Sequence, residues 1–122
     1  MDKENNTRNI RLAGVLQPLI SKILEKEGYN QDGTIITVTE VDINRALTLA
    51  KVFLSIFPEN KAKKIFDSIV KDIYQIQQQV NKQCQIKIVP KIIFKLDERV
   101  AKADEVEKLF LIDQKRISNI EE

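Results

Sequence analysis

The spacing of hydrophobic residues changes several times along the chain, and each change marks an expected element. Between residues 9 and 27, apolar side chains recur at intervals of three and four, which is typical of an amphipathic helix. Pro18 lies inside this helix. Since proline removes one backbone hydrogen bond there, we expect a kink or loose first turns. Gly28 ends the pattern, and residues 29–33 are rich in turn-forming types.

Two strand patterns follow at close range. Residues 34–41 are rich in β-branched types, and residues 47–57 alternate along their length. The short link between them predicts an antiparallel hairpin. In the second strand, Lys51, Phe53 and Ser55 point away from the core. The inward set is Ala50, Val52, Leu54 and Ile56.

The second half of the chain alternates between helix and strand. Residues 60–83 repeat apolar positions at helical spacing, with Asn60 as the candidate N-cap. Residues 86–95 then alternate as a third strand, in which Pro90 indicates an edge position or a bulge. Strand, crossover helix and strand form the unit that builds parallel strand pairs. A last amphipathic helix is expected over residues 100–112.

This order predicts an α+β fold, and the length of 122 residues indicates one domain. We expect a flexible N-terminus over residues 1–8, a folded domain over 9–112 and a flexible extension over 113–122. No apolar run approaches the roughly 20 residues of a membrane span. The N-terminus lacks the apolar segment of a signal peptide. The sequence therefore predicts a cytoplasmic protein without membrane contact.

The composition argues against most enzyme classes. Histidine is absent, and the three glycines form no phosphate-binding loop. The adjacent acids at 97–98 and at 104–105 are typical of helix starts, where they interact with the helix dipole. Cys84 is the only cysteine, so it forms no internal disulfide, and it reads as a small apolar residue. We expect no catalytic residue, no metal site and no cofactor.

The charge is distributed unevenly. Residues 45–95 contain ten Lys or Arg and only three acids, a net charge of +7, whereas the whole chain carries +2. Such a concentration of positive charge indicates a polyanionic partner. Lys87, Lys91 and Lys95 are expected on one face of the third strand, with Lys51 outward on the second strand of the same sheet.

Cations held on one surface can neutralise several phosphates of an RNA. The competing explanation is that exposed lysines on strands simply protect a sheet against aggregation. Phe53 could stack on a base, although packing is the commoner role of such an aromatic residue. The candidate RNA-binding residues are Arg8, Arg11, Arg45, Lys51, Lys61, Lys63, Lys64, Lys71, Lys82, Lys87, Lys91 and Lys95.

Four segments together resemble the bacterial ribosome-binding factor A family. They are the helical pattern of residues 11–27, the strand Ile36-Thr-Val-Thr-Glu-Val41, the run Leu47-Thr-Leu-Ala-Lys-Val-Phe-Leu-Ser55 and the run Ile88-Val-Pro-Lys-Ile-Ile-Phe-Lys-Leu-Asp97. The resemblance extends over residues 11–111. It is carried by the conjunction of these segments, whose order and separations match those of the family.

The resemblance implies a type II KH-like domain, with a three-stranded sheet and helices packed on one face. The family carries an Ala-x-Gly kink in its crossover, at a position that falls on Asp72-Ile73-Tyr74 here. Because this chain lacks both small residues, the crossover is expected either to be straighter or to bend by another route. The implied function is assembly of the small ribosomal subunit.

By the same resemblance, the protein would bind immature or free small subunits and their rRNA and assist late maturation, including 5′-end processing. It would act as a monomer and would not be an enzyme. Two other functions stay open. One is a generic RNA-binding KH-like module, and the other is a protein-interaction adaptor that docks through its acidic C-terminal helix.

Overall fold

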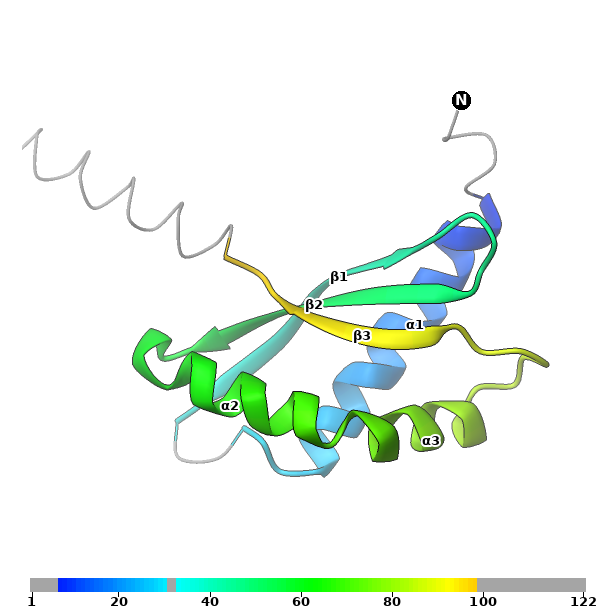
Figure 1. Ribbon diagram of the computed structural model, residues 1–122. Helices are drawn as coiled ribbons and strands as arrows, with labels where there is room; N and C mark the ends of the chain where they lie inside the picture. Colours follow the sequence, from blue (N-terminus) through cyan, green and yellow to red (C-terminus); the bar gives the residue numbers. More distant parts are fainter. Residues whose placement is uncertain (1–6, 31–32, 99–122) are drawn as a thin grey trace, which may run out of the picture.

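The elements follow the order helix, two strands, two helices and strand in the computed structural model, which describes residues 7–30 and 33–98 (Figure 1). Their bounds are α1 (Thr7–Lys26), β1 (Ile35–Ile43), β2 (Leu49–Phe57), α2 (Glu59–Lys71), α3 (Ile73–Gln83) and β3 (Lys91–Leu96). The predicted helix over 100–112 and the extension over 113–122 lie outside the described residues, as do residues 1–6.

The three strands form one mixed sheet with β2 in the centre. β1 and β2 pair antiparallel, which confirms the predicted hairpin, and the register shifts between Val38 and Glu40. β2 and β3 pair parallel, as the crossover predicts. In this register, Val52 of β2 lies between Val41 of β1 and Phe94 of β3. These three side chains are all buried.

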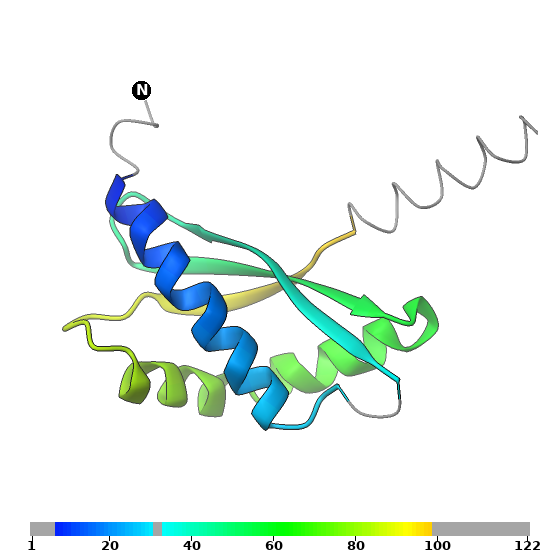
Figure 2. The ribbon, with the colours of Figure 1, turned by 180° about the vertical axis from the view of Figure 1, so that it is seen from behind.

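One face of the sheet carries the hydrophobic core. The predicted inward set on β2 is buried, and Ala50, Val52 and Leu54 have no exposed surface at all. These side chains belong to one cluster with buried residues of α1, α2 and α3. In Figure 2, α1 lies in front of the strands, and α2 and α3 follow one another beside the sheet. In the opposite view of Figure 1, α1 lies behind the strands, and α2 passes across the lower end of β1.

The first helix continues through its proline. α1 contains Pro18 and runs for 20 residues, so residues 9–27 were predicted correctly to within two residues. Leu16 and Ile20 flank the proline and are fully buried, and this burial stabilises the helix on both sides of the missing hydrogen bond. Thr7 and Arg8 also belong to α1. The expected flexible N-terminus over residues 1–8 is therefore wrong at those two positions.

The third strand is shorter than predicted. It begins at Lys91, whose N–H donates to the carbonyl of Thr48 at 2.9 Å, and Lys91 pairs with Leu49. Since β2 itself begins at Leu49, residues 86–90 have no partner strand beside them. Alternation alone suggested strand over 86–95, but only its second half finds a neighbour to pair with.

The crossover is broken into two helices. α2 ends at Lys71 and α3 begins at Ile73, so the single predicted helix over 60–83 was wrong at its centre. Asp72 between them has φ −94° and ψ 13°, outside the helical region, and its N–H is shared by the carbonyls of Ser68 and Ile69. The predicted cap was also wrong, because α2 begins at Glu59 and Asn60 lies within it.

A tyrosine from outside the crossover holds this break. The hydroxyl of Tyr29, in the segment after α1, donates to the Oδ2 atom of Asp72 at 2.5 Å. Burial, followed by this hydrogen bond and the carboxylate charge, raises the pKa of Tyr29 well above its ordinary value. The protonated phenol therefore connects the end of α1 to the junction of α2 and α3. The chain thus bends where the resemblance places a kink, without the small residues.

We predict that Tyr29→Phe lowers the free energy of unfolding by about 1 kcal/mol at neutral pH, because a partly buried hydrogen bond is lost. The pKa of Tyr29 is higher in the folded protein than in the unfolded chain. The protonated hydroxyl therefore makes its full contribution to the free energy of unfolding below the unfolded pKa of about 10. This contribution is lost as the pH rises through the pKa of the folded protein. Urea denaturation at several pH values measures both effects. Tyr74→Phe is the control because Tyr74 is 72% exposed, and an equal loss there would contradict the assignment.

Candidate nucleic-acid interface

The twelve predicted RNA-binding residues are all exposed, but they fall into separate groups on the described structure. One group lies on the sheet, a second at the end of α3 and in the following loop, a third on α2 and a fourth near the start of α1. In that order they are Lys51, Lys91 and Lys95; Lys82 and Lys87; Lys61, Lys63, Lys64 and Lys71; and Arg8, Arg11 and Arg45.

The sheet group occupies the face opposite the core. Lys51 alternates with the buried residues of β2, and Lys91 and Lys95 alternate with the buried Ile92 and Phe94 of β3. Because parallel strands in register point neighbouring residues to the same side, all three ammonium groups leave from one surface. We call these three lysines the sheet-face lysines. The prediction that Lys51, Lys91 and Lys95 share a face is confirmed.

An aromatic ring and two carboxylates share this surface. Phe53 is half-buried on β2, paired with Lys95 on β3 and with Glu40 on β1. Asp42 on β1 pairs with Lys51 in the same way. The face is therefore divided, with acids along β1 and lysines along β2 and β3. A polyanion is attracted to the β2–β3 side and repelled from the β1 side.

Lys87 does not belong to the sheet face, contrary to the sequence prediction. It lies in the segment between α3 and β3, and Lys82 precedes it in the last turn of α3. Both side chains are exposed. The regular four-residue spacing of Lys87, Lys91 and Lys95 suggested one strand face, but the strand begins only at Lys91. Lys87 instead lies ahead of the start of the strand, where it adds positive charge to the preceding loop.

A glutamine of α3 fixes the start of β3. The side-chain oxygen of Gln77 accepts the N–H of Ile92 at 2.7 Å, and its side-chain nitrogen donates to the carbonyl of Pro90 at 3.2 Å. These bonds satisfy backbone groups at the free edge of the sheet, where no further strand of the described chain pairs. No local pattern distinguishes Gln77 from its glutamine-rich surroundings. Its effect is to hold Lys91 and the preceding segment in place.

The α2 lysines lie on the helical side of the molecule. α2 packs through Ala62 and Ile69, which are buried, while Lys61, Lys63 and Lys64 project from its exposed surface. Glu59, Asp67 and Asp72 lie within or beside this helix. Acids and lysines are therefore interspersed along α2, whereas on the sheet face the acids lie along β1 and the lysines along β2 and β3. It does not join the sheet-face lysines in one continuous strand surface.

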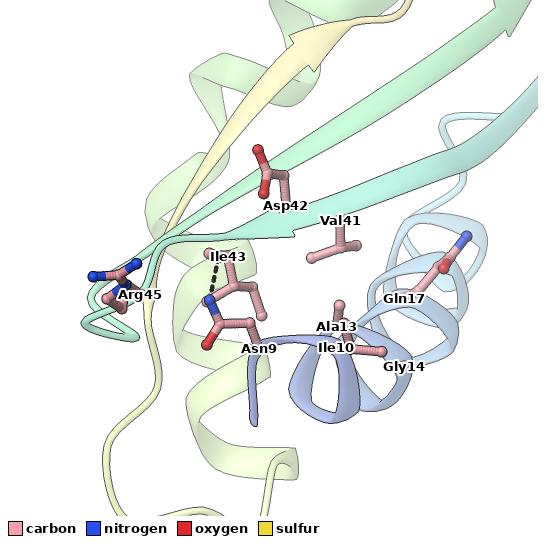
Figure 3. Close-up of a pocket in the computed structure, with 9 residues that line it drawn as sticks. All are labelled: Asn9, Ile10, Ala13, Gly14, Gln17, Val41, Asp42, Ile43 and Arg45. Carbon is pink, nitrogen blue, oxygen red and sulfur yellow. Dashed lines mark hydrogen bonds between the residues drawn. The ribbon is translucent and has the colours of Figure 1, made fainter. Parts of the chain in front are cut away.

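One member of the arginine group, Arg45, lies beside a hollow between α1 and β1 (Figure 3). Arg45 in the β1–β2 turn lines this hollow together with Asp42. Asn9 in α1 donates to the carbonyl of Ile43 at 2.9 Å, and Gln17 donates to the carbonyl of Val38 at 2.8 Å. Neither side chain was singled out from the sequence. Both attach α1 to the outer edge of β1 and so position the turn that carries Arg45.

A buried carboxylate anchors the other end of the sheet. Asp97 accepts a hydrogen bond from the Oγ1 atom of Thr39 at 2.6 Å, and its N–H donates to the carbonyl of Leu54 at 2.7 Å. Thr39 is the residue at which the β1 register shifts. Asp97 therefore joins β3 to the irregular point of β1 across β2. Its partners give it a structural role, and the helix that residues 97–98 were expected to open lies outside the described residues.

The described part of the chain offers no cluster of three potential metal-ligating side chains. Cys84 is a buried free thiol between α3 and β3, in agreement with its reading as a small apolar residue. Among the described helices, none is long and apolar enough to cross a membrane. The exposed lysines of β2 and β3 form a charged surface on the sheet.

Comparison with known proteins identifies the relatives of this chain. A family model described as ribosome-binding factor A matches residues 8–110. Ribosome-binding factor A of Natranaerobius thermophilus is 33% identical over 103 residues, which is 84% of this chain and 79% of the relative. The protein of the same name from Brevibacillus brevis is 28% identical over 106 residues, or 86% of this chain and 88% of the relative.

The fold has a counterpart among solved structures. The crystal structure of ribosome-binding factor A from Thermus thermophilus matches with a TM-score of 0.61 and covers 71% of this chain and 92% of its own. The two sequences are 11% identical, so this match supports a shared fold and nothing more. It agrees with the predicted type II KH-like α+β domain, whose sheet carries its helices on one face.

We predict that Gln77→Leu destabilises the protein by about 1–2 kcal/mol, because the N–H of Ile92 loses its partner at the start of β3. Amide hydrogen exchange at Ile92 should accelerate, while exchange at the centre of β2 changes less. Gln78→Leu is the matched control, because Gln78 is exposed and donates to the hydroxyl of Tyr74 on its own helix. Equal exchange at Ile92 in both variants would show that Gln77 does not hold the strand.

Proposed function

The chain belongs to the ribosome-binding factor A family, and from this premise we propose that it is an assembly factor of the small ribosomal subunit. In this proposal it binds free or immature small subunits through their rRNA and assists late maturation, including processing of the 5′ end by nucleases. It acts in the cytoplasm as a monomer and performs no catalysis itself.

One observation carries the RNA-binding part of the proposal. Lys51, Lys91 and Lys95 project from a single sheet face, and all three side chains are exposed. Ordinary protection of a strand edge would place lysines on the outermost strand, yet Lys51 lies on the central strand β2. A set of cations spread over two rigid strands matches a row of phosphates and releases counterions when it binds.

Among the twelve basic residues, we propose that the sheet-face lysines make the principal contact and that Lys82 and Lys87 extend it. The α2 lysines and the arginines near α1 stand on other surfaces, and they would contribute mainly to long-range attraction. This ranking follows from the charge around Lys82, Lys87, Lys91 and Lys95, because no acid occurs between residues 73 and 96, whereas three acids accompany the α2 lysines. Among the sheet-face lysines, Lys51 pairs with an acid, Asp42 on β1.

A generic RNA-binding module would use the same lysines without selecting the ribosome. We therefore predict that the purified protein cosediments with free small subunits and not with assembled ribosomes, and that the binding weakens as salt is raised. Separated subunits and intact ribosomes at low and moderate salt provide the measurement. Equal binding to large subunits would favour the generic module, and absence of small-subunit binding at low salt would remove the assembly-factor proposal.

A second prediction maps the surface by changing charge without adding repulsion. Replacing the sheet-face lysines by glutamine should lower the slope of log binding constant against log salt by about 2–3, since each phosphate contact contributes roughly 0.7–0.9. The control is Lys61, Lys63 and Lys64 changed to glutamine, which removes the same charge from α2. An equal loss of slope in both triple variants would contradict the assignment to the sheet face. Unchanged binding in both would favour an adaptor that docks through its C-terminal segment.

A further inference from the structure

The segment between α3 and β3 combines exposed apolar side chains with positive charge. We call residues 84–90 the α3–β3 loop. Ile88 in this loop is 77% exposed and Ile86 is 38% exposed. Two large aliphatic side chains, only two positions apart, thus expose apolar surface to water, and burying this surface against a partner would be favourable. Alternation over residues 86–95 predicted a strand with both isoleucines on the face opposite Lys87, so their exposure in a loop is a finding of the structure.

The base of this loop is anchored on both sides. Cys84 and Pro90, its first and last residues, are buried. The N–H of Cys84 donates to the carbonyl of Val80 at 2.8 Å, and Gln77 donates to the carbonyl of Pro90. Figure 1 shows the segment projecting beyond the start of β3. The two isoleucines are therefore presented from a fixed base.

The charge around the loop selects the class of partner. No acid occurs between residues 73 and 96, which contain four lysines. Three of them, Lys82, Lys87 and Lys91, lie in the last turn of α3, within the loop and directly after it. Partners carry complementary charge, and the exposed isoleucines are accompanied only by cations along the chain, so the partner is negatively charged. A polyanion that also offers apolar surface fits it best.

Resting on the proposed function, we propose that the α3–β3 loop inserts Ile88, supported by Ile86, against an unpaired nucleotide of the small-subunit rRNA. Unpaired bases expose flat apolar faces, which stacked duplexes hide, and proteins commonly recognise RNA at such sites. Lys87 and Lys91 then reach the phosphates on either side. The loop would add a contact that does not depend on salt to the electrostatic contact of the sheet-face lysines.

The first test separates apolar from electrostatic binding. Ile88→Ser should weaken binding of the full chain to purified small subunits about tenfold, because the burial of one isoleucine is lost. The slope against salt should stay unchanged, since no phosphate contact is removed. Ile35→Ser is the matched control, because Ile35 is 59% exposed and pairs with Phe57, at the opposite end of β2 from Leu49, beside which β3 begins. Both positions are exposed, and urea denaturation checks that both variants remain folded.

The second test identifies what the loop touches. A photoreactive benzoylphenylalanine at position 88 should crosslink to rRNA when the protein is bound to small subunits, and the same group at position 35 should not. Crosslinking to a ribosomal protein instead, or to neither, would overturn the inference. If the unmodified chain binds small subunits and Ile88→Ser binds equally well, only this inference fails. If the unmodified chain does not bind small subunits, the result contradicts the proposed function, on which this inference rests.

Discussion

The alternation of side chains on the central strand β2 is the constraint on which the rest of the structure depends. Its inward residues are fully or nearly fully buried, and its outward residues include Lys51 and Phe53. Because β2 pairs with both other strands, it fixes which residues of β1 and β3 face each side. A slip of one residue would bury Lys51 and expose Val52, so the core and the basic surface are specified together.

The parallel pairing of β2 and β3 imposes the next requirement. The chain must return from the end of β2 to the start of β3, and it does so through α2 and α3. A straight helix would carry it past the sheet, whereas the break at Asp72 allows α2 to pack on β2 and α3 on β3. In relatives of the family, as the resemblance implies, small residues make this bend. Here the Tyr29 hydroxyl holds a carboxylate at the same place.

Periodic patterns in the sequence predicted the helices and strands well. Contacts between distant segments could not be predicted in this way. The helix over 9–27, the hairpin and the parallel crossover all follow from periodicity and connection length. The strand over 86–95 was half wrong, because Ile86 and Ile88 alternate as a buried strand does but lie beyond the start of β2. Likewise, nothing local marks Gln77 or Tyr29, whose partners lie 13 to 43 residues away.

For the candidate surface too, the sequence predicted one part and the structure added another. The excess of positive charge over residues 45–95 is plain from the sequence, but only the register shows that Glu40 and Asp42 line the opposite side of the same face. Phosphates approaching the sheet are repelled along β1 and attracted along β3, so the charge gradient runs across the strands. An RNA bound in this field would follow β3 toward the α3–β3 loop, where the positive charge continues and the exposed Ile88 lies. Attraction and apolar contact therefore act at the same edge of the sheet, and the strand order that places β3 there determines both.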